Sequence, residues 1–234
     1  MTNEIIIKIM LSLVAISFII VIVVKRFVYF RPGKYSEIPT ENYTDIRHGN
    51  LHGWLLQNPQ ATRIVLFCKD RTGNITHCQD KIIAIRDLGY NVLAFDYSGY
   101  GKSQGIPNEQ QLYDDASIMT SLVRQEYSPE QIILYGDGVI GTSVALHASI
   151  KYSIPTVIID SPLTSINVLA KRFLGYAQIL AFPFTEFNIE PLLRVYRGKT
   201  LMFNSDNTVL QSKATTYIDT VDPPWDDIKK FVDL

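Results

Sequence analysis

The sequence is poor in cysteine and histidine and has no excess of charge of either sign. Of its 234 residues, two are cysteines, Cys68 and Cys78, which is too few for a disulfide framework, although one bridge between them stays open. The 22 basic and 23 acidic residues nearly cancel, so charge gives no reason to expect nucleic acid as a partner. All four histidines lie at or before His147, so residues 148–234 contain no imidazole that could act as a general base.

Motifs for metals and phosphates are also missing. Cys68, His77 and Cys78 lie close in sequence, but these three residues show neither C-x-x-C nor H-x-x-x-H spacing. No G-x-x-x-x-G-K segment occurs. Glycines 136, 138 and 141 match the dinucleotide pattern G-x-G-x-x-G, but they fall on a late strand rather than the first βαβ unit. Nucleotide binding is therefore the weaker interpretation, and we expect no metal and no cofactor.

A long apolar run lies near the N-terminus. Residues 9–24 contain no charged side chain, and extending the run back to Ile5 gives 20 residues, enough for one helical crossing of a bilayer. The nearly neutral start and the pair Lys25-Arg26 favour a retained anchor over a cleaved signal peptide. We therefore predict a transmembrane anchor with its flanks at residues 1–26, with residues 5–24 in the lipid bilayer. A linker at 27–42 and a globular domain at 43–234 follow.

The charges beside this run predict an orientation. More basic residues follow it than precede it: Lys25, Arg26, Arg31 and Lys34 against Lys8, which Glu4 offsets. The positive-inside bias then places the globular domain of a single-pass membrane protein on the cytoplasmic side. Two glycosylation sequons, at Asn42 and Asn74, would matter only for the opposite topology. The aromatic residues Tyr29, Phe30 and Tyr35 fit either an interfacial belt or packing on the domain.

From about residue 43, short β-type runs alternate with helical spacing. Strands are expected in a hairpin at 45–57 that turns at Gly49-Asn50, and at 63–68, 91–95, 131–135, 156–160 and 200–204. Helices are expected at 80–88, 108–126, 141–151 and 210–220, with mixed helical pieces between 163 and 197. This alternation predicts an α/β fold with a doubly wound, mostly parallel sheet. The structure of residues 222–234 stays open.

Several motifs in the domain follow one another in a specific order. They are LHGW (51–54), GNITH (73–77), DYSGYGKSQG (96–105), PNE (107–109), LYDDA (112–116) and DSPLTS (160–165). Through them, residues 43–210 resemble membrane-tethered α/β-hydrolases of the group that includes protein depalmitoylases and related serine hydrolases. The resemblance implies an α/β-hydrolase fold. It also implies a site with a serine on a strained elbow, a histidine base, an acid that orients it, and an oxyanion hole.

At the elbow, this chain departs from the family. The segment IILYGDGVIGT (132–142) lies where the family has G-x-S-x-G, and the serine position holds Gly138. Glycine adopts the strained elbow angles at little steric cost, so the fold survives without the nucleophile. Asp137 or Asp206 as a substitute nucleophile is an alternative. Around Asp137, however, the positions that must be small hold Tyr135 and Val139.

The other catalytic positions depart as well. Asp206 matches the family's acid, but with no later histidine to orient we expect it to cap the following helix. His147 falls on the helix after the elbow, where we expect a packing or surface role. In the oxyanion loop, Lys69-Asp70 replaces the family's His-Gly, and Val139 holds the other donor position.

Together these departures predict a membrane-anchored pseudohydrolase. Its role would be binding or scaffolding, with a protein partner or with an acyl or lipid ligand in the vestigial pocket. The alternative is an active serine-hydrolase-type esterase or thioesterase with relocated catalytic residues, acting on lipid or acyl-protein substrates.

Overall fold

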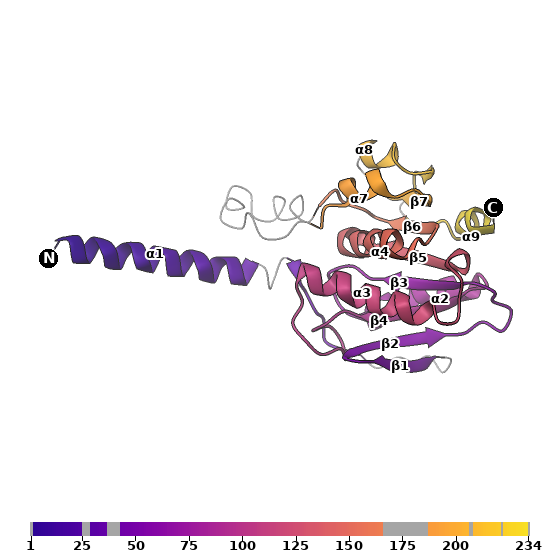
Figure 1. The fold of residues 1–234 in the computed structure, drawn as a ribbon, viewed down its shortest axis with the longest axis horizontal. Helices are drawn as coiled ribbons and strands as arrows, with labels where there is room; N and C mark the ends of the chain where they lie inside the picture. The colour runs from indigo at the N-terminus through magenta and orange to yellow at the C-terminus, as the bar shows by residue number, and fades with distance from the viewer. Residues whose placement is uncertain are drawn as a thin grey trace.

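A computed structural model describes residues 2–24, 29–36, 43–165, 187–205, 208–220 and 222–233 (Figure 1). Predictions that fall on residues 166–186, and on Asp206, lie outside the described residues. The domain is built on an eight-stranded sheet in the order β1-β2-β4-β3-β5-β6-β7-β8. The pairs β1–β2 and β2–β4 are antiparallel and all the others are parallel. This confirms the predicted α/β fold with a mostly parallel sheet.

The strands lie close to their predicted positions. They are β1 Thr44–His48, β2 Leu51–Leu56, β3 Ile64–Cys68, β4 Asn91–Asp96, β5 Ile132–Asp137, β6 Thr156–Asp160, β7 Lys199–Phe203 and β8 Thr216–Ile218. The hairpin β1–β2 turns at Gly49, whose φ is +58°. Every residue of β3 and of β4 is buried, as the continuous apolar runs of a two-sided sheet require.

Helices cover both faces of the sheet, and each face has its own apolar core. One core gathers α3 Glu109–Val123, α4 Gly138–Tyr152 and α7 Ile189–Val195. The other gathers α2 Gln79–Asp87 and α9 Trp225–Asp233, together with the 3₁₀ helix η2 Ile75–Cys78. Alternate residues of one strand serve the two cores: Leu134 faces the first, and Ile133 and Tyr135 face the second. A short 3₁₀ helix, η3 Pro129–Gln131, leads into β5.

Capping explains where the predicted helix α3 begins. Asn108 is its N-cap, and the side-chain oxygen accepts a hydrogen bond from the backbone N–H of Gln111 at 3.0 Å. Beyond α2, Gly89 has a φ of +106°, as expected for the glycine that follows a helix end. These local signals could be read from the sequence because each involves residues close together in the chain.

The helix predicted at 210–220 is wrong. Only α8, Thr208–Gln211, is helical, and the chain then returns to the sheet as β8, parallel to β7. Thr215 and Thr200 hold this return: each threonine hydroxyl accepts a hydrogen bond from the other's backbone N–H, at 3.0 and 2.8 Å. A run of β-branched and aromatic residues with an open sheet edge beside it favours a strand over a helix. The C-terminal residues that the sequence left open form α9.

The N-terminal apolar run forms the helix α1, Thr2–Val24. It extends away from the domain in Figure 1, and its apolar side chains are exposed, Phe18 by 67% and Val14 by 66%. Among the residues that the structure describes, no helix reaches the combined length and apolarity needed to cross a membrane. The predicted helix is therefore confirmed, but the predicted membrane span is not.

The segment after α1 lies against the domain. Tyr29 and Phe30 are buried in the first core. The N–H of Arg31 donates to the carbonyl of Arg71 at 3.0 Å, and the N–H of Gly73 donates to the carbonyl of Arg31 at 2.8 Å. Of the two interpretations of these aromatic residues, the structure supports packing on the domain.

Candidate functional site

The predicted elbow is present as a turn from strand to helix without an intervening loop. The strand β5 ends at Asp137 and α4 begins at Gly138, three residues earlier than predicted. Gly138 has a φ of +65°, a left-handed conformation in which a side chain is strained. This turn lies at the carboxyl end of a parallel strand, where α/β proteins place their ligand sites.

The two flanking glycines have packing roles. A Cβ on Gly136 would lie 2.5 Å from the Cα of Thr142, and one on Gly141 would lie 2.1 Å from the carbonyl oxygen of Cys68. Both glycines allow α4 to lie directly on the sheet. This close approach accounts for the glycine spacing that resembles a dinucleotide fingerprint.

Asp70 occupies the space in which an elbow side chain would stand. A Cβ placed on Gly138 would lie 2.4 Å from Cγ, 2.5 Å from Oδ1 and 2.8 Å from Cβ of Asp70. Oδ1 of Asp70 accepts a hydrogen bond from the N–H of Ile140 at 3.3 Å. The carboxylate therefore interacts with the positive end of α4, where a negative charge is favourable. The sequence placed Asp70 in the oxyanion loop but did not show that it fills the nucleophile's place.

Lys69 shapes the loop that carries Asp70. Its side chain is fully buried, and Nζ donates to the carbonyls of Asp70 at 2.9 Å and Thr72 at 3.5 Å. Nζ also lies 4.2 Å from the centre of the Tyr100 ring. Burial lowers the pKa of Lys69, although nearby carboxylates, Asp96 first among them, oppose the shift. Lys69 thus turns inward and offers no cation to a ligand at the elbow.

The remaining predicted oxyanion position is Val139, which is buried and follows Gly138 directly in α4. The structure thus brings Asp70, Gly138 and the start of α4 together. The predicted acid, Asp206, lies outside the described residues.

Within the described part of the chain, the histidines contact residues other than those of the elbow. His48 is exposed on β1. His77 accepts a hydrogen bond at Nδ1 from the N–H of Asn74 at 3.2 Å. His147 stacks on Tyr113 with ring centres 4.5 Å apart, and burial lowers its pKa, with Lys151 adding to the shift. The packing role expected for His147 agrees with this contact.

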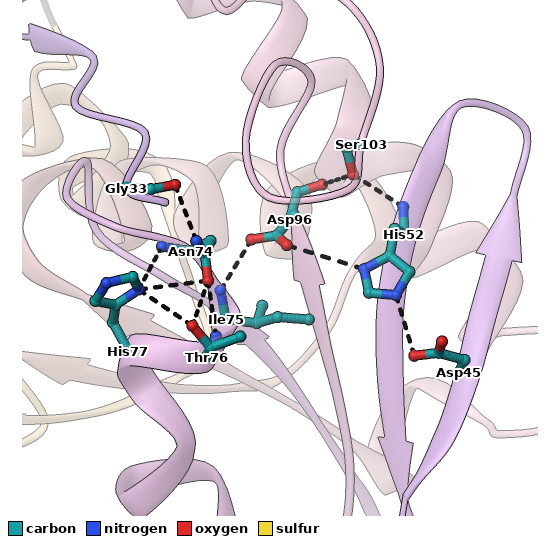
Figure 2. A network of polar contacts seen from close by, with 9 residues as sticks. All are labelled: Gly33, Asp45, His52, Asn74, Ile75, Thr76, His77, Asp96 and Ser103. Atoms are coloured by element: carbon teal, nitrogen blue, oxygen red, sulfur yellow. Dashed lines mark hydrogen bonds and ion pairs between the residues drawn. The ribbon is translucent and has the colours of Figure 1, made fainter. Parts of the chain in front are cut away.

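The fourth histidine belongs to a buried network that sequence reasoning missed (Figure 2). His52 is fully buried, with Nε2 3.1 Å from Oδ1 of Asp45 and Nδ1 3.9 Å from Oδ2 of Asp96. The other carboxylate oxygen of Asp96 accepts a hydrogen bond from the N–H of Ile75 at 2.9 Å. Ser103 links β2 to β4, because its hydroxyl accepts a hydrogen bond from the N–H of His52 on β2 and donates one to the carbonyl of Asp96 on β4.

This network explains why the family motifs contain these residues. Asp96 and Ser103 come from the DYSGYGKSQG segment, His52 from LHGW and Ile75 from GNITH. Asn74, from GNITH, donates to the carbonyl of Gly33 at 3.0 Å and so attaches the segment after α1. The motifs therefore hold the loops at this end of the sheet. The sequence signal that could have revealed this network is a charged residue, Asp96, at the end of a largely apolar strand.

A second cluster lies beside the elbow on the opposite side of the sheet from α4. Lys81, on α2, donates to Asp137 at 2.7 Å and also to Asp160. Tyr135 donates to the same oxygen of Asp160 at 2.9 Å. Burial raises the pKa of Asp137 to about 6, an effect that Lys81 opposes. Burial alone would lower the pKa of Lys81, but the two carboxylates outweigh it and raise that pKa, so Lys81 keeps its proton.

Comparisons with known proteins agree with the fold. A family described as serine aminopeptidase, S33, matches residues 59–221. Human α/β-hydrolase domain-containing protein 17B is 33% identical over 111 residues, 46% of this chain and 38% of that protein. Protein 17B of Xenopus laevis is 42% identical over 110 residues, with the same coverage. Mouse protein 17C is 44% identical over 80 residues, 33% of this chain and 25% of its own length. The chain thus matches less than half the length of these curated relatives.

Solved structures extend the likeness over most of the chain. An esterase from Pyrococcus furiosus has a TM-score of 0.69 at 16% identity, covering 88% of this chain and 97% of its own. Acetyl xylan esterase 1 from Thermoanaerobacterium has a TM-score of 0.58 at 14% identity, covering 86% of each chain. At these identities, the likeness shows the shared fold alone.

Proposed function

Since this chain belongs to the serine aminopeptidase S33 family of α/β-hydrolases, we propose that it is a member that binds a partner or ligand without hydrolysing it. One observation carries this proposal: the carboxylate of Asp70 occupies the place of the missing nucleophile. Loss of a serine alone leaves an empty site, whereas here another side chain fills the space. We therefore treat the elbow as a retained element of the fold.

Electrostatics support the proposal. Acyl transfer develops a negative charge at the substrate oxygen, and hydrolases stabilise it with backbone N–H groups. Here a carboxylate lies beside the predicted donor Val139, because Asp70 accepts a hydrogen bond from the N–H of the next residue, Ile140. A full carboxylate about 4 Å from a developing oxyanion would raise the barrier by about 4 kcal/mol at an effective dielectric constant near 20, or roughly 10³-fold in rate.

The alternative, a hydrolase with relocated residues, needs an activated nucleophile. Among the described serines, we take Ser161 as the candidate nucleophile. It follows β6 with a φ of +53° and lies next to the Lys81 cluster. Its hydroxyl donates to Oδ1 of Asp160 at 2.7 Å. Lys81 stays protonated and cannot accept a proton from it. The geometry therefore favours binding over relocated catalysis.

Chemical labelling tests the proposal directly. The full chain is treated with a fluorophosphonate probe and, separately, with a chromogenic ester and an acyl thioester. We expect no labelling that depends on folding and no turnover above a heat-denatured sample. Labelling lost in Ser161→Ala but kept in the exposed-surface control Ser36→Ala would show relocated serine chemistry. Turnover abolished by Asp137→Asn would show carboxylate chemistry, and either result would overturn the proposal.

We further propose that α1 attaches the protein to a membrane with the domain on the cytoplasmic side. The support is an exposed helix whose described side chains between Ile9 and Ile22 carry no charge. An apolar surface of this extent is unfavourable in water and is typical of an interaction site. The binding role would then be exercised at the membrane surface, on a protein partner or on an acyl or lipid ligand.

Fractionation tests this attachment. The full chain is expected in the membrane pellet, and two charges in α1, Leu13→Asp with Phe18→Asp, should release it. Ile150→Asp with Val195→Asp, at two exposed apolar sites beside the loop that leads into β6, is the matched control and should stay in the pellet. Resistance to carbonate separates insertion from peripheral binding, and protease sensitivity of the domain in sealed microsomes reports its side. A soluble wild-type chain would refute the attachment.

A further inference from the structure

The segment after α1 determines which end of the domain lies nearest to α1. Residues 29–36 contact the loop that follows β3, through the hydrogen bonds of Arg31 with Arg71 and Gly73 and that of Gly33 with Asn74. The carboxyl ends of β3 and β4 therefore lie beside the point at which α1 leaves the domain, as Figure 1 shows. If α1 is in a membrane, this end of the sheet faces the lipid surface.

Basic side chains are exposed at this end. Arg31 and Lys34 lie on the segment after α1, and Lys102 lies on the loop after β4. Nζ of Lys102 is 4.4 Å from the centre of the Tyr35 ring, which brings that loop against the same segment. We call Arg31, Lys34 and Lys102 the basic rim.

The basic rim lacks counter-charges from the protein. Among the residues that the structure describes, no ion pair involves any of its three side chains. From residue 5 to residue 36 the sequence contains no aspartate or glutamate. The next acid along the chain is Glu37, and the described acids Asp45 and Asp70 contact His52 and the N–H of Ile140, respectively. The rim is therefore free to interact with anions outside the chain.

We propose that the basic rim binds the headgroups of anionic lipids at the surface of the bilayer that holds α1. This inference rests on the proposed membrane attachment. Each basic side chain near an anionic membrane strengthens binding by about five-fold, and the effect falls off within a Debye length. Three such residues, positioned by the contacts of residues 31–35, would also restrict the domain to one orientation, with the loops around Asp70 and Gly138 toward the lipid.

A vesicle-binding experiment on the full chain tests this inference. Partitioning is measured into vesicles of phosphatidylcholine alone and of phosphatidylcholine with phosphatidylserine, and the ratio of the two is compared between variants. Taking the ratio removes the contribution of α1, which is the same in both. The rim variant combines Arg31→Gln, Lys34→Gln and Lys102→Gln. The control variant combines Lys199→Gln, Lys229→Gln and Lys230→Gln.

The control removes the same charge from the other end of the domain. Lys199 is the first residue of β7, and Lys229 and Lys230 are exposed on α9, which lies at the end away from α1 in Figure 1. We expect wild type and control to prefer anionic vesicles, and the rim variant to lose about 10- to 100-fold of that preference. Raised salt should reduce the wild-type preference.

Three results would overturn the inference: an unchanged preference in the rim variant, an equal loss in the control, or loss of the wild-type preference in millimolar inorganic phosphate at constant ionic strength. The last would indicate a site for soluble anions. Failure of the proposed attachment is distinguishable, because wild type would then not bind neutral vesicles. Binding to anionic vesicles would still report on the rim.

Discussion

The space beside Gly138 makes a quantitative prediction about stability. A methyl group introduced by Gly138→Ala meets two penalties: a left-handed φ of +65° and overlap with the side chain of Asp70. Rotation about the Cα–Cβ bond of Asp70 would move its carboxyl group but not its Cβ, which itself lies 2.8 Å from the new atom. The backbone must therefore shift.

The chain offers a control in which only the first penalty applies. Gly49 has a φ of +58°, and a Cβ on it would meet nothing within 4 Å. Gly49→Ala should lower the free energy of unfolding by about 1–2 kcal/mol, because alanine is strained in the left-handed conformation. Gly138→Ala should cost about 2–5 kcal/mol, because overpacking adds about 1–3 kcal/mol. The entropic effect of replacing glycine in the unfolded chain is common to both variants and cancels.

Denaturant unfolding of the purified chain measures these values, and a double-mutant cycle assigns them. In an Asp70→Gly background, which also removes the Cβ of residue 70, the cost of Gly138→Ala should fall to that of Gly49→Ala. If Gly138→Ala costs no more than Gly49→Ala in the wild-type background, Asp70 does not fill the elbow, and the main support for a non-hydrolytic site is lost.

Three more predictions concern activity, pH and the buried network. Gly138→Ser combined with Asp70→Gly should still not hydrolyse a chromogenic ester, because in the residues that the structure describes no histidine contacts the elbow to accept the proton; measurable turnover would show that another group acts as the base. Burial raises the pKa of Asp137 to about 6, so the folded state holds the carboxyl proton more tightly than the unfolded chain does. The stabilisation that this protonation gives is therefore complete below about pH 4 and is lost as the pH rises to about 6. Unfolding free energies of wild type minus Asp137→Asn should therefore fall by about 1–3 kcal/mol over that interval, and a flat difference would contradict the assignment. Asp96→Val should cost about 1–3 kcal/mol more than Asp96→Asn, since only the amide oxygen still accepts from the buried N–H of Ile75; equal losses by thermal unfolding would argue against this hydrogen bond.

Local patterns predicted most of the fold. The continuous apolar runs of β3 and β4, the cap at Asn108 and the turn at Gly49 each depend on neighbours in the chain, and the structure confirms them. The segment after Leu210 was misassigned because its strand depends on β7, which supplies hydrogen bonds from another part of the sequence. The β-branched and aromatic residues of this segment form a strand because the edge of β7 is available to pair with them.

The sequence by itself determined that the serine position holds Gly138 and that residues 148–234 contain no histidine, since no folding can supply a hydroxymethyl group or an imidazole to these residues. Only the tertiary structure decided what stands in their place. The pairing of β3 with β5 brings Asp70 against Gly138, and the pairing of β2 with β4 brings His52 against Asp96. Such contacts depend on the order and register of strands, which are set by packing of the whole sheet and cannot be read from spacing along the chain.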